Sequence, residues 1–320
     1  MSIPLAFRFL LGRDEFKESE HPRKEDGEFA PKGGGGAATP KASTSSLTGT
    51  TTLVNGRHMQ ANGQPLPKHI PRIPPAWTNV RYSTDPKSEV LVSGLDKKGR
   101  KQVVYSDEHW AKAAKAKFGR IQKLQKKFDG IKAQNAKLRT SKDPVQRDLA
   151  DTLHLIMTMG LRPGSDADTG AEKKAYGATT LLGSHVVDEG GETYLRFTGK
   201  KGVALSLKVP DKQLAKELKQ RSANAGANGK LFPRVDNRSL RKYVAKLDGG
   251  GFKTKDFRTL IGTSLAYDLV KKMDKPTSKS GYKKAVKAVG RAVSETLGNT
   301  PTIALQSYIN PVVFADWRLE

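Results

Sequence analysis

Two very short turns constrain the fold of this chain more than any other feature. Residues 185–209 read as three β-strands, interrupted by turn residues at 188–191 and again at 199–202. A connection this short joins antiparallel neighbours, because a parallel crossover needs a dozen or more residues. The segment is therefore predicted to form a three-stranded antiparallel meander.

Apolar residues on both sides of this meander recur with the period of an α-helix. One stripe over 149–157 is followed by Gly160, a residue type that often ends a helix. Two further stripes cover 257–269, with Thr254 as a candidate N-cap, and 286–297. A small antiparallel sheet set among helices predicts an α+β fold.

The last helix is predicted to be short. Gly298 ends the stripe before it, and Thr300 followed by Pro301 provides a capping hydroxyl and a proline suited to the first helical position. Tyr308 then falls on the last turn. The spacing places this tyrosine at a helix terminus near the end of the sequence.

The chain is strongly basic, with 57 Lys and Arg against 32 Asp and Glu and a formal net charge of +25. Residues 71–320 carry +23 of this charge, and residues 1–70 carry only +2. An excess of this size indicates binding to a polyanion, with nucleic acid a better candidate than an anionic membrane. A ribosomal protein, or a basic protein with no such partner, can have the same composition, so charge alone does not decide.

A small β-rich domain is expected before the helical region. Short β-like runs lie at 80–82, 90–92 and 102–105, with a turn at 96–99 between the last two. We therefore expect a β-rich N-terminal domain over residues 70–112.

The flanking segments differ from this domain in composition. Residues 107–128 have a basic helical pattern, which fits a solvated face, a hinge or a surface facing DNA. The mainly helical domain is expected over 113–320. Residues 1–69 are rich in Gly, Ser, Thr and Pro and have almost no apolar periodicity, so they are expected to form a disordered tail.

The chain contains no cysteine, which excludes disulfides, thiol nucleophiles and cysteine-based metal sites. No apolar run approaches the roughly 20 residues of a membrane span. The opening residues 1–11 are too short and too interrupted for a signal peptide. A cytoplasmic protein without a membrane partner is expected.

Five residues of the helical region are candidates for phosphodiester chemistry. Tyr308 can attack phosphorus and form a phosphotyrosine bond that conserves the energy of the broken bond. Arg162 and Arg258 can hold the non-bridging oxygens, and Asn299 can donate a neutral hydrogen bond. Lys200 can protonate the leaving 5′ oxygen. This chemistry requires no metal ion or cofactor.

Each candidate has an ordinary alternative when taken alone. Arg162 after a helix end fits a surface arginine, and Tyr308 fits a half-buried packing tyrosine. The Gly-Lys-Lys-Gly sequence is ordinary hairpin chemistry, and its spacing does not choose between Lys200 and Lys201. The interpretation as a phosphodiester site rests on all five residues occurring together in this order along the chain.

That order resembles the type IB DNA topoisomerases of the compact poxvirus and bacterial kind. The family motifs are Leu/Ile-Arg-x-Gly-Asn/Ser, Tyr-Gly-x-Thr-Thr-Leu, Phe-x-Gly-Lys-x-Gly, Lys-Asp-Phe-Arg-Thr, and Leu-Gly-Asn-Thr-Pro followed by Ser/Cys-Tyr-Ile. The matching segments are 161–165, 176–181, 197–202, 255–259 and 297–309. Segments 73–78 and 94–102 resemble the N-terminal signature, so the resemblance covers about residues 70–315.

Departures from the family pattern are few. Pro163 and Ser165 stand where bacterial relatives usually have Val and Asn, and Asn310 replaces a histidine. Asn299 also stands in the place of a histidine and cannot shuttle a proton. The closest alternative is a tyrosine recombinase or integrase, but the histidine of its His-x-x-Arg motif is Lys255 here. A non-enzymatic DNA-binding protein is the alternative from a different class.

The resemblance implies a mainly helical catalytic domain of the tyrosine recombinase/topoisomerase IB type and an N-terminal domain that closes as a clamp on duplex DNA. It implies Tyr308 as nucleophile, Lys200 as general acid, and Arg162, Arg258 and Asn299 as transition-state ligands. Such an enzyme nicks one strand through a 3′-phosphotyrosyl intermediate, allows rotation and religates without ATP or metal. The expected partner is duplex DNA, preferably supercoiled, bound by a monomer. The expected location is the nucleoid of a bacterial cell or phage-infected host.

Overall fold

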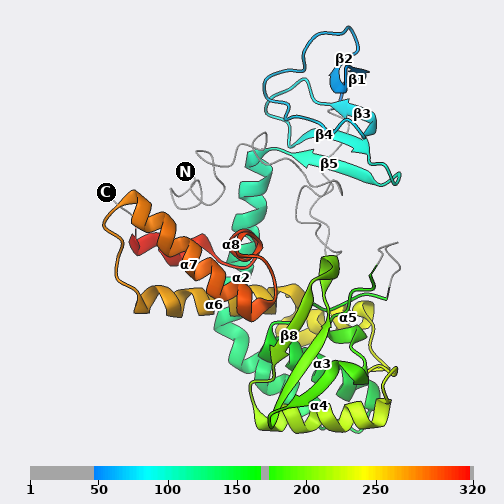
Figure 1. Cartoon of the computed structure of the whole chain (residues 1–320), viewed down its shortest axis with the longest axis vertical. Helices are drawn as coiled ribbons and strands as arrows, with labels where there is room; N and C mark the ends of the chain where they lie inside the picture. Colours follow the sequence, from blue (N-terminus) through cyan, green and yellow to red (C-terminus); the bar gives the residue numbers. More distant parts are fainter. Residues whose placement is uncertain (1–46, 167–172, 318–320) are drawn as a thin grey trace. The chain divides into compact units, whose positions relative to one another are not determined.

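The computed structural model of the chain describes residues 47–166 and 173–317. The described residues divide into two compact units, with the boundary between Phe118 and Gly119; the strands of the first are coloured blue to cyan in Figure 1, and the strands and later helices of the second green to red.

The first unit contains a five-stranded antiparallel sheet in the order β2-β1-β3-β4-β5. Its strands are β1 (Gly49–Val54), β2 (Arg57–Gln60), β3 (Thr78–Tyr82), β4 (Val90–Leu95) and β5 (Lys101–Tyr105). The strands predicted over 80–82, 90–92 and 102–105 are β3, β4 and β5. One cluster of buried apolar side chains stabilises the sheet: Ile70, Ile73, Trp77, Val80, Tyr82 and Val92.

The hairpin of β1 and β2 lies within the segment expected to be a tail, so the expectation that order begins at residue 70 is wrong. Asn55 and Gly56 both have positive φ, as a two-residue hairpin turn requires. Tyr82 of β3 donates a hydrogen bond to Gln60 at 3.2 Å. The hairpin lacks apolar periodicity because threonines fill much of β1, and periodicity alone therefore missed it. Residues 1–46 of the expected tail lie outside the described residues.

The long helix α2 (Asp107–Arg139) contains residues of both units. It begins where the basic helical pattern predicts and continues eleven residues beyond 128, the end of that pattern. The expected domain boundary at 112–113 and the boundary of the compact units at 118–119 both fall inside this helix.

The second unit has a three-stranded antiparallel sheet among helices, which is the predicted meander in an α+β fold. Its strands are β6 (Val186–Glu189), β7 (Glu192–Thr198) and β8 (Ala204–Lys208). Its other helices are α3 (Pro144–Met159), α4 (Lys212–Ala225), α5 (Asn237–Lys246), α6 (Thr254–Lys272), α7 (Lys279–Leu297) and α8 (Pro301–Ser307). Short 3₁₀ turns are η2 (Ala178–Thr180), η3 (Gly183–His185), η4 (Lys200–Gly202), η5 (Leu247–Gly249) and η6 (Pro311–Trp317).

Helix α3 packs against α5 and α6. Asp143 accepts a hydrogen bond from the backbone of Val145 at 2.9 Å and caps the helix start. Leu153, Leu155 and Ile156 are fully buried. Burying a side chain of this size stabilises the fold by roughly 1.5–3 kcal/mol.

Within residues 47–166 and 173–317, no helix has the length and apolar composition needed to cross a bilayer.

Candidate active site

The end of α3 fixes the backbone of Arg162. The helix stops at Gly160, whose φ of 64° lies in the left-handed region that glycine tolerates. Arg162 follows two residues later, and its carbonyl oxygen accepts a hydrogen bond from the Ala178 amide at 2.8 Å. The motif segment 176–181 therefore holds the arginine in place after the helix ends.

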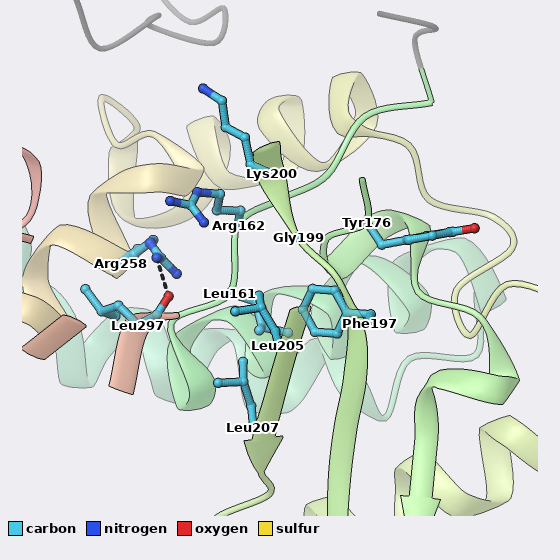
Figure 2. Close-up of a pocket in the computed structure, with 10 residues that line it drawn as sticks. All are labelled: Leu161, Arg162, Tyr176, Phe197, Gly199, Lys200, Leu205, Leu207, Arg258 and Leu297. Carbon is cyan, nitrogen blue, oxygen red and sulfur yellow. Dashed lines mark hydrogen bonds between the residues drawn. The ribbon is translucent and has the colours of Figure 1, made fainter. Parts of the chain in front are cut away.

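Arg258 lies in the second turn of α6, and its side chain is almost fully buried, with 3% of its surface exposed. Its Nη1 donates a hydrogen bond to the carbonyl of Gly160 and its Nη2 donates to the carbonyl of Leu297. The Nε–H finds no partner in the described parts of the chain. One guanidinium group thus joins the C-terminal ends of α3 and α7, and one of these bonds is dashed in Figure 2.

Tyr308 lies against this guanidinium group. It is the C-cap residue of α8, one position beyond the last helical residue, and its amide donates to the carbonyl of Ala304 at 2.9 Å. The guanidinium carbon of Arg258 lies 4.6 Å from the centroid of the Tyr308 ring. The structure therefore brings together two residues that are 50 positions apart in the sequence.

Asn299 follows Gly298, the left-handed residue that ends α7. Its amide is satisfied when its oxygen accepts a hydrogen bond from Arg258 Nη2 at 3.2 Å and its nitrogen donates to the carbonyl of Thr300 at 3.2 Å. Asn299 thus directly neighbours Arg258.

Lys200 lies in the turn between β7 and β8, as predicted, where η4 begins. One pocket is lined by Arg162, Lys200 and Arg258, together with Tyr176 and apolar side chains. In the view of Figure 2, Arg162 lies between Lys200 and Arg258. Arg162 and Lys200 line the same pocket as Arg258. Asn299 neighbours Arg258, and Tyr308 contacts it through its ring, so the fold brings all five predicted residues together.

The two arginines and the tyrosine perturb each other electrostatically. Burial lowers the pKa of Arg258 to about 10, and the charge of Arg162 adds to this effect. Burial raises the pKa of Tyr308, but the charges of Arg258 and Arg162 outweigh burial, and the net pKa is lowered. The site therefore favours the phenolate form of Tyr308 more than water does.

The start of α6 differs from the sequence expectation. The N-cap residue is Lys253 rather than Thr254, and Asp256 accepts the Lys253 amide at 2.9 Å. Arg120 of α2 binds both oxygens of the buried Asp256, at 2.6 and 2.9 Å. An acidic residue three positions after an N-cap is the local signal for this capping. The partner Arg120 is 136 residues away, and no local pattern identifies it.

Over residues 47–166 and 173–317, no group of three or more His, Cys, Asp or Glu side chains is arranged to hold a metal ion. The functional groups of the pocket are cationic and hydrogen-bond donors, so the site is suited to binding an anion.

Comparison with known proteins points to one family. The family model for the catalytic core of eukaryotic DNA topoisomerase I matches residues 101–310. The chain is 31% identical to DNA topoisomerase 1B of Acanthamoeba polyphaga mimivirus, over 74% of this chain and 75% of that protein. It is also 23% identical to DNA topoisomerase 1 of Rabbit fibroma virus (strain Kasza), over 76% of this chain and 77% of that protein.

The matched region includes all five site residues, and the similarity extends over most of the length of both viral proteins. The chain therefore belongs to the type IB DNA topoisomerases.

Proposed function

We propose that this protein relaxes supercoiled duplex DNA through a covalent bond between Tyr308 and a 3′ phosphate. The observation that carries the proposal is the contact of Tyr308 with the buried Arg258, in a site where Arg162 is the next cation. A phosphodiester bound by the two arginines would lie beside the tyrosine hydroxyl, as attack on phosphorus requires.

In the proposed cleavage step, the Tyr308 oxygen forms a bond to phosphorus, and the bond from phosphorus to the 5′ oxygen breaks. The phenol proton leaves to solvent, and the leaving 5′ oxygen takes a proton from Lys200. Arg162 and Arg258 hold the charge on the non-bridging oxygens, and Asn299 adds a neutral hydrogen bond. Reversal of the same step reseals the strand, so neither ATP nor a metal ion is consumed.

Rotation of the free 5′ end between the two steps removes supercoils. The β-rich unit, whose first strand begins at Gly49, contributes a further DNA-binding surface in this proposal. The net charge of +23 over residues 71–320 supports binding to the DNA backbone. We expect a monomer that acts on the nucleoid in the cytoplasm and prefers supercoiled DNA.

Plasmid relaxation in EDTA and without ATP tests this function. The wild-type protein should convert supercoiled plasmid to relaxed topoisomers, and Tyr308→Phe should not. Tyr267→Phe is the matched control, because Tyr267 is 48% exposed on α6 and is not part of the site. Relaxation that needs a metal ion or ATP, or strand exchange without relaxation, would contradict the proposal and favour a recombinase.

A substrate with sulfur in place of the bridging 5′ oxygen tests Lys200, because the sulfur leaves without needing a proton. Lys200→Ala should cleave the normal bond slowly and the sulfur bond at a largely restored rate. Arg162→Ala should stay slow on both bonds. Rescue of Lys201→Ala instead of Lys200→Ala would assign the acid to the second lysine.

A further inference from the structure

The tyrosine's backbone is held by α6, the helix that also carries Arg258. The hydroxyl of Thr263 donates a hydrogen bond to the carbonyl of Tyr308 at 3.1 Å. The same hydroxyl accepts a hydrogen bond from the amide of Asn310, also at 3.1 Å. One side chain therefore binds the chain on both sides of Ile309, immediately after α8 ends.

The neighbouring residue, Gly262, makes this approach possible. A Cβ atom added to Gly262 would lie 2.9 Å from the Tyr308 carbonyl oxygen and 3.1 Å from the Tyr308 Cβ. Real Cβ atoms are rarely found so close to other atoms, so a larger residue would push the tyrosine backbone away from α6. Position 262 accepts the approach because glycine has no side chain.

Arg258 and Gly262 are four residues apart on α6 and therefore lie on the same face of the helix. The helix thus fixes the guanidinium group by one turn and the tyrosine backbone by the next. The same helix therefore carries Arg258 and contacts the backbone of Tyr308, whose ring centroid lies 4.6 Å from the Arg258 guanidinium carbon.

We infer that Thr263 is a positioning residue, whose hydroxyl fixes the Tyr308 backbone so that the phenol oxygen lies at attack distance from a phosphate held by Arg258. This inference rests on the proposed function. The Thr263 hydroxyl does not touch DNA or the reacting atoms in this role and acts only through Tyr308. Because in-line attack is sensitive to displacements of about 1 Å, loss of the two hydrogen bonds should slow the chemical step and leave DNA binding unchanged.

The test is the single-turnover cleavage rate of a labelled duplex, with DNA affinity and thermal unfolding measured on the same samples. Thr263→Val keeps the shape of the side chain and removes both hydrogen bonds, so cleavage should slow by roughly 10- to 100-fold with an unchanged Kd. Thr263→Ser restores the hydroxyl and should cleave within about threefold of the wild-type rate. The matched control is Thr152→Val on α3, whose buried hydroxyl donates to the backbone carbonyl of Asp148 in its own helix at 2.7 Å.

Two further measurements separate positioning from other causes of a slow rate. A displaced nucleophile is not helped by a better leaving group, so Thr263→Val should stay slow on the sulfur substrate that rescues Lys200→Ala. A tyrosine moved away from the two guanidinium groups loses the charges that favour its phenolate. The rising limb of the pH–rate profile should therefore move to higher pH in Thr263→Val.

Three results would overturn the inference: wild-type cleavage by folded Thr263→Val, a Thr263→Ser variant as slow as Thr263→Val, or sulfur rescue of Thr263→Val. If Thr263→Val is unfolded at the assay temperature, Thr263→Ala replaces it, since it removes the same hydrogen bonds with less bulk. Wild-type protein that forms no covalent adduct would contradict the proposed function itself. An active wild type with an equally active Thr263→Val would contradict the positioning role alone.

Discussion

The second unit contains two groups of arginines that differ in whether carboxylates neutralise their charge. The site arginines, Arg162 and Arg258, form no ion pair within the described parts of the chain, and Arg258 donates to two backbone carbonyls and to the Asn299 amide. The paired arginines, by contrast, are all bound to carboxylates. They are Arg139, Arg221 and Arg234, bound to Asp148, Asp151 and Glu217.

One arginine from each group, Arg258 and Arg139, shows a pKa shift, and the two shifts have opposite signs. Burial lowers the pKa of Arg258 to about 10 because no carboxylate compensates for the lost water. For Arg139, burial also lowers the pKa, but Asp151 and Glu217 outweigh it, and the net pKa is raised. Buried cations are normally paired, because an unpaired buried charge is costly.

The difference indicates what each group is for. The paired arginines are neutralised within the fold and stabilise the packing of α2, α3 and α4. The site arginines keep a positive charge that the fold leaves uncompensated, and an anionic ligand such as a phosphodiester would supply the missing partner. In this unit, a cluster of arginines therefore indicates an anion-binding site only where no carboxylates pair with the arginines.

The largest predicted effect is on catalysis, from Arg258→Ala. Removing one charged donor from the transition state should slow single-turnover cleavage by roughly 10²–10³, because Arg258 is one of the two cations, with Arg162, whose charge acts on Tyr308. Quenched cleavage of a labelled duplex measures this rate. A near-wild-type rate for folded Arg258→Ala would remove the functional distinction between the two groups.

The converse substitution, Arg221→Ala, should affect stability instead. Arg221 Nη1 bonds to the buried Asp148 at 2.9 Å and to the carbonyl of Leu231 at 3.0 Å. Its loss leaves Asp148 with Arg234 alone, and the free energy of unfolding should fall by about 2–3 kcal/mol, less than for a fully buried pair. Urea denaturation measures this change. A cleavage rate reduced as much as in Arg258→Ala, without lost stability, would contradict the comparison.

A smaller effect is expected from Asn299→Ala. The substitution removes one hydrogen bond from a neutral amide to the transition state, and such a bond is weaker than one from a charged donor. Cleavage should slow by about tenfold, clearly less than in Arg258→Ala under the same conditions. If Asn299→Ala were the slower variant, Asn299 would have more than the role of a neutral ligand.

The smallest predicted effect is a shift in pH dependence. The rate at limiting enzyme should rise as Tyr308 ionises below the ordinary tyrosine value and fall above about pH 10 as Arg258 loses its proton. In Arg162→Ala, Tyr308 loses one of the charges that lower its pKa, so the rising limb should move to higher pH. An unmoved limb would show that Arg162 does not influence the nucleophile electrostatically.

Sequence patterns predicted the parts of this molecule that depend on local chemistry. The ends of α3 and α7 follow from Gly160 and Gly298, and the β7–β8 turn follows from its glycines. The β1–β2 hairpin was missed because its threonines hide the alternation of an edge hairpin.

Partners far apart in the sequence could not be predicted either. The pair of Arg120 with Asp256 and the bonds of Thr263 to the Tyr308 segment join positions separated by 136 and 45 residues. Such contacts are set by how the helices pack, and no local period or spacing encodes them. The motif order identified the reacting groups but not the residues that hold them in place.

The most direct test of the account identifies both ends of the covalent bond. Strands labelled at either end are cleaved, denatured and resolved on gels, and the protein–DNA adduct is digested and mapped by mass spectrometry. The account predicts that the protein remains on the 3′ phosphate, that the modified peptide contains Tyr308, and that Tyr308→Phe yields no adduct. A 5′ linkage, or an adduct that persists in Tyr308→Phe, would contradict it.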